Sequence, residues 1–153
     1  MLSVDVAKGS AVRIGATKDF KQPRAAVLAC YRDPARYEAV LQGLGAQVSR
    51  TAGPPRMAWA CVMTWRGERR VFEIETVETT LDQTIKIVMT SALALAEITL
   101  DFRDLPDGGC RITGCAELTA RTIAAKLALQ SLRLVRGKAE NRLERFITAM
   151  GRP

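Results

Sequence analysis

The chain has 153 residues and a mass of 16.7 kDa, which is enough for one globular domain with a hydrophobic core. Hydrophobic residues make up 48% and charged residues 25%, which argues against disorder, and 23 basic against 16 acidic side chains leave a formal charge of +7. The chain contains no histidine, which excludes Ser-His-Asp and Cys-His catalysis and histidine-ligated zinc.

The first third of the chain predicts one strand followed by two short helices. Val12–Ala16 alternates apolar and polar residues, as a half-buried strand does. A helix is expected to begin around Pro23, since proline is tolerated in a first helical turn and good helix formers follow it. The pair Asp33–Pro34 predicts a second helix with the aspartate as its N-cap, and this helix should end at Gly43 or Gly45.

From residue 46 onward, alternating apolar and polar side chains predict a series of antiparallel strands joined by short turns. Met57–Trp65 places its bulky side chains on one face, and the following strands do the same around Ile74, Ile87 and Leu100. Residues 91–97 have a helical composition, but their place between two strands favours a strand.

The segment from about Ala120 to Met150 predicts one long amphipathic helix, about 45 Å in length, that lies across the sheet. Small and apolar residues recur in it at steps of three and four. They are Ala124, Ala128, Ser131 or Leu132, Val135, Ala139, Leu143, Phe146 and Met150. Gly137 is the expected place of a kink or of a close approach to the sheet.

Nearly all the excess positive charge lies on this C-terminal segment. Residues 119–153 carry eight basic and two acidic side chains. Like charges three or four residues apart repel one another weakly, and an anionic partner would relieve that repulsion. The bases expected to contact such a partner are Arg133, Arg136, Lys138, Arg142 and Arg145. Phospholipid headgroups or an acidic protein or ligand would fit. Nucleic acid is disfavoured because no aromatic residues interleave with the bases. The alternative is a solvated helix face.

The four cysteines, Cys30, Cys61, Cys110 and Cys115, show neither a CxxC pair nor the spacing of zinc ligands. Cys110 and Cys115 should point to opposite faces of one strand, because side chains alternate along a strand. We therefore expect four reduced cysteines that act as small core residues in a reducing compartment. The first six residues lack the apolar stretch of an export signal, and no run reaches the roughly 20 apolar residues of a membrane span. A cytoplasmic location is expected.

This order of elements predicts an α+β fold in which the long helix covers the apolar face of one antiparallel sheet. Four stretches carry a resemblance to a known family: FKQPRAAV at 20–27, DPARY at 33–37, LALQSL at 127–132 and RLERF at 142–146. They resemble the START-related, polyketide cyclase-like superfamily, often called SRPBCC. The resemblance implies a helix-grip fold. In this fold a curved antiparallel sheet of about seven strands grips the C-terminal helix around an apolar cavity, in a single domain spanning 1–153.

The resemblance also implies a function, since members of this superfamily bind lipids, sterols, polyketides or other apolar molecules. We therefore expect non-catalytic binding or transport of an apolar or amphipathic small molecule between the sheet and the long helix. One alternative is a polyketide cyclase- or dehydratase-like enzyme, since a minority of members are enzymes. Another is a module that docks on an anionic membrane or protein through its basic helix.

The residues expected to contact the ligand are the bulky inward-facing strand residues and the small residues of the helix. They are Trp59, Cys61, Met63, Trp65, Phe72, Ile74, Ile98, Leu100, Phe102, Ala128, Ser131 and Val135. Trp59 and Trp65 are the leading members, because indole joins a large apolar surface to one N–H donor. Thr76, Gln130 and Ser131 are weaker candidates for polar contacts. The alternative is an ordinary close-packed core.

The sequence offers no catalytic constellation. Glu73, Glu75, Glu97 and Asp101 alternate out of phase with the apolar residues and should face solvent. Tyr37 occupies an apolar helical position and is expected to pack. No catalytic residue, metal or cofactor is predicted.

Overall fold

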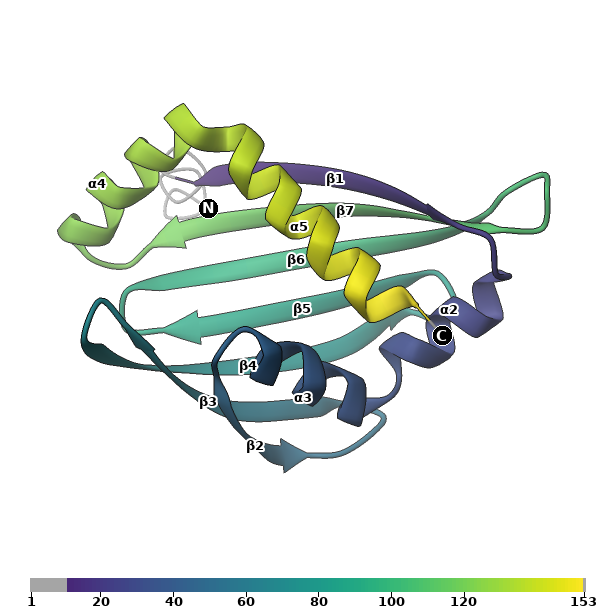
Figure 1. The fold of residues 1–153 in the computed structure, drawn as a ribbon, viewed down its shortest axis with the longest axis horizontal. Helices are drawn as coiled ribbons and strands as arrows, with labels where there is room; N and C mark the ends of the chain where they lie inside the picture. The colour runs from purple at the N-terminus through teal and green to yellow at the C-terminus, as the bar shows by residue number, and fades with distance from the viewer. Residues whose placement is uncertain (1–10, 153) are drawn as a thin grey trace.

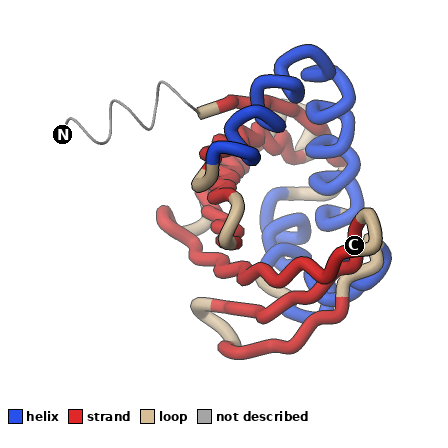
Figure 2. Tube along the Cα trace, turned by 90° about the vertical axis from the view of Figure 1, so that its left-hand side faces the viewer, coloured by secondary structure: helices blue, strands red, loops and turns tan. Residues whose placement is uncertain are grey.

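The computed structural model describes residues 11–152 and forms one curved antiparallel sheet with helices on its concave side (Figures 1 and 2). The residues that bear on an export signal, 1–6, lie outside this range. In chain order the elements are β1 (Val12–Phe20), α2 (Arg24–Tyr31), α3 (Pro34–Gly43), β2 (Gln47–Ala52), β3 (Met57–Trp65), β4 (Glu68–Thr80), β5 (Thr84–Ser91), β6 (Ala94–Asp104), β7 (Cys110–Ala120), α4 (Ile123–Leu132), the 3₁₀ turn η1 (Arg133–Val135) and α5 (Arg136–Gly151).

The seven strands lie in the order β1-β7-β6-β5-β4-β3-β2, and every neighbouring pair is antiparallel. Helices α2 and α3 carry the chain from the β1 edge to the β2 edge. The turns β3–β4 and β5–β6 lie at the end of the sheet where β7 leads into α4, here called the α4 end (Figure 1, left). The turns β2–β3, β4–β5 and β6–β7 lie at the opposite end, here called the α2 end. This is the predicted helix-grip arrangement.

The two short helices form where the sequence predicts them. The Asp33 side chain accepts a hydrogen bond from the backbone N–H of Ala35 at 3.0 Å and caps α3, whose first residue is Pro34. The helix ends at Gly43. Pro23 is the N-cap of α2, which begins one residue later.

The strand predictions are also confirmed, with one correction among the cysteines. Residues 92–93 form a turn, and β6 begins at Ala94, so most of 91–97 is extended. Cys30, Cys61 and Cys110 are buried and unpaired, but Cys115 is exposed and cannot be a core residue. Because Cys115 is an odd number of residues from Cys110 along β7, it points to the convex, solvent-facing side.

The predicted C-terminal helical segment is confirmed, and it bends between α4 and α5, close to the position expected for a kink. Val135 has φ −119° and ψ 32°, outside the helical region, two residues before Gly137. The two halves have different main partners, because α4 packs on β7, whereas α5 packs mainly on β1 and on α2 and α3 (Figure 1). The bend lets one segment reach both places.

The bend also changes which residues face the sheet. In α5 the predicted stripe is confirmed, since Leu143 and Met150 are buried together with Ile147. In α4 no residue is fully buried. The half-buried ones there are Ala125, Leu129 and Leu132, whereas Ala124, Ala128 and Ser131 are exposed. The stripe loses its phase at the bend because helical spacing no longer relates the two halves.

No helix within residues 11–152 is both long enough and apolar enough to cross a bilayer.

Candidate functional site

The centre of the concave face is filled by side chains. Trp59, Ile74 and Leu100 of the sheet are buried, and Ile147 of α5 is buried against them. Gly114 of β7 marks how closely the helix approaches, since a Cβ there would lie 2.8 Å from the Ile147 Cδ1 atom. The space expected between the sheet and the long helix is therefore occupied beneath the C-terminal half of α5.

Aromatic rings close this packed centre. The Tyr31 ring lies edge-on to Phe102 at 5.1 Å between centroids, and the Tyr37 ring lies 5.0 Å from that of Trp59. Tyr37 is 2% exposed, which confirms the prediction that it packs. The Tyr31 hydroxyl donates to the carbonyl of Ile147 at 2.9 Å and so ties α2 to α5. Burial raises the pKa of both phenols, so both stay neutral near pH 7.

The indole N–H of Trp59 already has a partner. It donates to Glu38 Oε2 at 2.9 Å, and the same carboxylate accepts two hydrogen bonds from Arg50, at 2.6 and 2.8 Å. The Arg50 guanidinium and then the Trp59 indole hold the pKa of Glu38 below its ordinary value. This contact joins α3, β2 and β3, so Trp59 serves the fold through its ring and its N–H.

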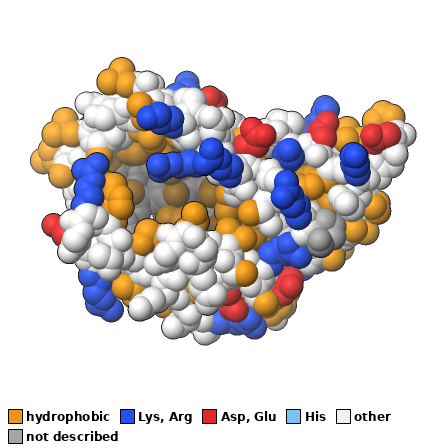
Figure 3. Space-filling model, viewed as in Figure 1, with side chains coloured by type: hydrophobic (Ala, Val, Ile, Leu, Met, Phe, Trp, Pro, Cys, Tyr) orange, Lys and Arg blue, Asp and Glu red, His pale blue; other side chains and the backbone are white. Residues whose placement is uncertain are grey.

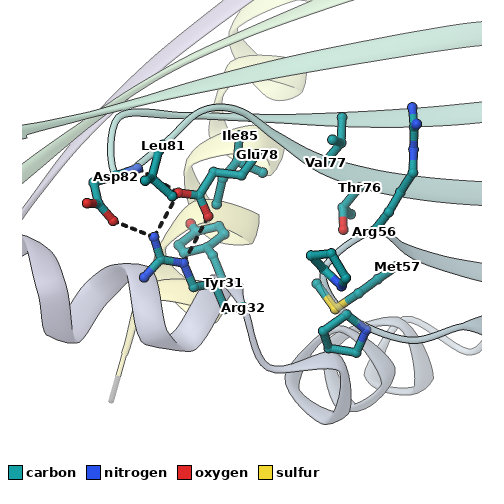
Figure 4. Close-up of a pocket in the computed structure, with 12 residues that line it drawn as sticks. Tyr31, Arg32, Arg56, Met57, Thr76, Val77, Glu78, Leu81, Asp82 and Ile85 are labelled. Atoms are coloured by element: carbon teal, nitrogen blue, oxygen red, sulfur yellow. Dashed lines mark hydrogen bonds and ion pairs between the residues drawn. The ribbon is translucent and has the colours of Figure 1, made fainter.

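A pocket of about 730 Å³ opens beside the packed centre, at the α2 end (Figure 4). It lies between α2, the β2–β3 loop and the β4–β5 turn. Its lining consists of Tyr31, Arg32, Pro54, Pro55, Arg56, Met57, Thr76, Val77, Glu78, Leu81, Asp82 and Ile85. We call it the α2-end pocket.

The floor of the α2-end pocket is mostly apolar and its rim is charged. Tyr31, Met57, Thr76 and Ile85 are buried and form the floor. At the rim the Arg32 guanidinium bonds both oxygens of Glu78, at 2.9 and 2.7 Å, and reaches Asp82 at 2.6 Å (Figure 4).

The charged groups of the rim form ion pairs with one another. Arg32 lowers the pKa of Glu78, and the carboxylates of Glu78 and Asp82 raise that of Arg32, so Glu78 and Arg32 are both ionised near neutral pH. The pocket thus joins an apolar interior to a polar edge, which suits a molecule with an apolar body and a polar end. Among residues 11–152, no cluster of three or more Cys, Asp or Glu side chains is arranged to hold a metal ion.

A second open region lies on the concave face toward the α4 end. Met63, Phe72, Met89, Ile98 and Leu118 face inward there but are only partly buried. Figure 3 shows this side of the molecule hollowed, with hydrophobic side chains on the walls and Lys or Arg side chains along the margin. We call this region the open half. The packed centre lies between the open half and the α2-end pocket.

None of the twelve residues predicted to contact a ligand lines the α2-end pocket. Five lie in the packed core: Trp59, Cys61, Ile74, Leu100 and Phe102. Three lie in the open half: Met63, Phe72 and Ile98. Four are exposed: Trp65, Ala128, Ser131 and Val135. Of the weaker candidates, Thr76 is in the pocket floor. Ligand contact by these residues stays a prediction.

The residues at the pocket rim were missed, although one carried a signal. Glu78 is in phase with Ile74 and Thr76 along β4, so alternation alone places it on the inward face. Arg32 and Asp82 are 50 residues apart and meet only because α2 folds back over the β4–β5 turn. No local pattern links them.

The solved structures with similar folds differ widely from this chain in sequence. No protein-family model and no curated protein matches the sequence. A truncated norcoclaurine synthase from Thalictrum flavum is 12% identical with a TM-score of 0.65, over 92% of this chain and 91% of that one. The Zhui aromatase/cyclase from a Streptomyces species is 10% identical with a TM-score of 0.64, over the same shares.

A protein from Thermus thermophilus is 19% identical with a TM-score of 0.64, over 92% of this chain and 94% of that one. These likenesses confirm the helix-grip fold that the sequence resemblance implies, and at such identities they carry the fold alone.

Proposed function

We propose that the protein binds an apolar or amphipathic small molecule, lipid-, sterol- or polyketide-like, in the α2-end pocket. The observation that carries this proposal is the pocket itself. Its volume of about 730 Å³ is within the range of about 300–1,000 Å³ typical of small-molecule sites, and an apolar floor meets a polar rim. Affinity would come mainly from burial of apolar area, at roughly 25 cal/mol per Å².

The state of the polar groups supports binding without chemical change. Glu78 is ionised but fully engaged by Arg32, and the Tyr31 hydroxyl is engaged by Ile147, so neither is free to move a proton. The rim can instead orient a ligand whose polar end forms hydrogen bonds with Arg32 or Asp82. A reducing, cytoplasmic setting is part of the proposal, since all four cysteines are unpaired.

The direct test is extraction of the purified chain with organic solvent, followed by mass spectrometry for a co-purified apolar molecule. Binding of the fluorescent probe 1-anilinonaphthalene-8-sulfonate then locates the site. Ile85→Trp fills the α2-end pocket, and Ile98→Trp is the matched change in the open half. We expect Ile85→Trp to weaken probe binding about tenfold, roughly 1.4 kcal/mol, and Ile98→Trp to have little effect.

Circular dichroism melts of both variants establish that the folds are intact. The reverse pattern would move the binding site to the open half. An empty extract together with no probe binding by the wild-type chain would refute the proposal.

A further inference from the structure

We propose that the α4 end of the molecule is a docking surface for an anionic phospholipid bilayer. The surface, here called the α4 tip, comprises α4 with η1, the β5–β6 turn and the β3–β4 hairpin, which lie at one end of the sheet (Figure 1). It is separate from the α2-end pocket, so the two proposals stand or fall independently.

Large apolar side chains protrude from all three segments of the α4 tip. Leu134 is 88% exposed, Ile123 83% and Trp65 55%. Leu127 of α4 and Leu93 of the β5–β6 turn are exposed as well. Two of the segments are joined directly, since the backbone N–H of Arg121 donates to the carbonyl of Leu93 at 2.8 Å, and the β3–β4 hairpin lies at the same end of the sheet (Figure 1). A group of exposed apolar residues at one place marks an interaction surface.

Helix α4 is the main part of this surface. Its ten residues, IAAKLALQSL, have the composition of a core helix, yet none of them is fully buried. The side chains of Ala125, Leu129 and Leu132 cover the sheet only in part, and Ile123 and Leu127 lie away from them. An apolar helix in this position is expected to lie in the plane of a lipid interface, where such side chains enter the acyl boundary.

The charge of the α4 tip complements an anionic bilayer. Among residues 64–71, 91–95 and 118–135 there are six basic side chains and one acidic one, Glu68. The bases are Arg66, Arg69, Arg70, Arg121, Lys126 and Arg133. Of these, only Arg70 has a carboxylate partner within residues 11–152, and that partner is Glu68 itself. Arg66 stacks on Trp65 with 4.6 Å from guanidinium carbon to ring centroid, so base and apolar anchor protrude together.

The same charge argues against a second copy of this chain, since two such tips would bring like charges together. The proposed surface also involves a different set of basic residues from the one predicted from the sequence. Of the bases named from the sequence, Arg133 belongs to the α4 tip, whereas Arg136 donates to the carbonyl of Arg13 and lies with Lys138, Arg142 and Arg145 on α5.

Co-sedimentation with vesicles tests the proposal on the full chain. We expect binding to phosphatidylcholine vesicles that contain one third phosphatidylglycerol, weak binding to phosphatidylcholine alone, and weaker binding at high salt. The double variant Arg133→Glu with Leu134→Asp should lose at least tenfold in vesicle affinity, since one base near an anionic surface is worth about fivefold. Both positions are exposed, so folding should be unaffected.

The matched control is Lys21→Glu with Ala25→Asp, which makes the same change of charge at exposed positions near the α2 end that do not line the α2-end pocket. It should retain wild-type vesicle binding within about twofold. Equal loss in both variants would overturn the proposal, because net charge alone would then explain binding. Absence of vesicle binding by the wild type would overturn it too, whether or not an acidic protein or a second copy occupies the tip.

Discussion

Two buried tyrosines differ in whether the hydroxyl group has a hydrogen-bond partner. Tyr31 and Tyr37 lie in the same packed centre, with ring centroids 6.5 Å apart. The Tyr31 hydroxyl donates to the Ile147 carbonyl, whereas the Tyr37 hydroxyl has no hydrogen-bond partner anywhere in the described part of the chain. A buried polar group without a partner carries its full desolvation cost.

Removal of each hydroxyl should therefore have opposite consequences. We expect Tyr31→Phe to lower the free energy of unfolding by about 1 kcal/mol, because Ile147 loses its donor. Tyr37→Phe should be neutral or should raise it by up to about 1 kcal/mol, since it removes only an unsatisfied group. Urea denaturation of the two variants measures both values. An equal loss in both would show that the Tyr37 hydroxyl is satisfied.

At the scale of elements, the Glu38 carboxylate links α3 to two strands at once. It accepts hydrogen bonds from Arg50 of β2 and from Trp59 of β3. The edge strand β2 is mostly exposed along its length, so this link supplies much of its attachment beyond the backbone pairing with β3. An ion pair with partners this exposed contributes little to stability by itself.

The link predicts a pH dependence of stability. The pKa of Glu38 is lowered in the fold, so its contribution is present above the unfolded value of about 4.5 and is lost as pH falls through the folded value. Glu38→Gln should cost about 1 kcal/mol near pH 7, and this difference from the wild type should shrink below about pH 4.5. Thermal melts from pH 7 to acid measure it.

Glu73→Gln is the matched control, because Glu73 is exposed on the convex face and, within the described range, has no ion-pair partner. It should change stability by less than about 0.5 kcal/mol at every pH. A constant difference between Glu38→Gln and the wild type down to acid pH would show that the charge of Glu38 does not stabilise the fold.

The elements themselves could largely be predicted from the sequence, because their signals are local. The Asp33–Pro34 cap and the alternation of the strands need only neighbouring residues. The bend at Val135 lies two residues from Gly137, where the sequence places a kink, but the face that α4 turns to the sheet could not be predicted, since it depends on which elements each half of the helix contacts. The contact between Arg32 and Asp82 at the pocket rim could not be predicted either, because only the folded chain brings these two residues together.

At the scale of the whole molecule, packing is unevenly distributed along the C-terminal segment. Leu143, Ile147 and Met150 of α5 are buried in the core, whereas α4 buries no residue fully. Truncation of a buried leucine, isoleucine or methionine to alanine costs about 2–5 kcal/mol of stability. Three such side chains hold α5 in the core, whereas α4 has none. The bend therefore divides a well-anchored helix from a weakly anchored one.

Amide hydrogen exchange should reveal this division. Opening of α4 exposes little new surface, so its amides should exchange by local opening, at least about tenfold faster than those of residues 143–150. Low concentrations of urea should hardly change exchange in α4, because the denaturant effect scales with the area exposed. Exchange at 143–150 should accelerate steeply with urea, as in global unfolding. Mass spectrometry of peptides from 123–132 and 143–150 compares the two, and equal protection with equal urea dependence would mean that the whole segment opens as one unit.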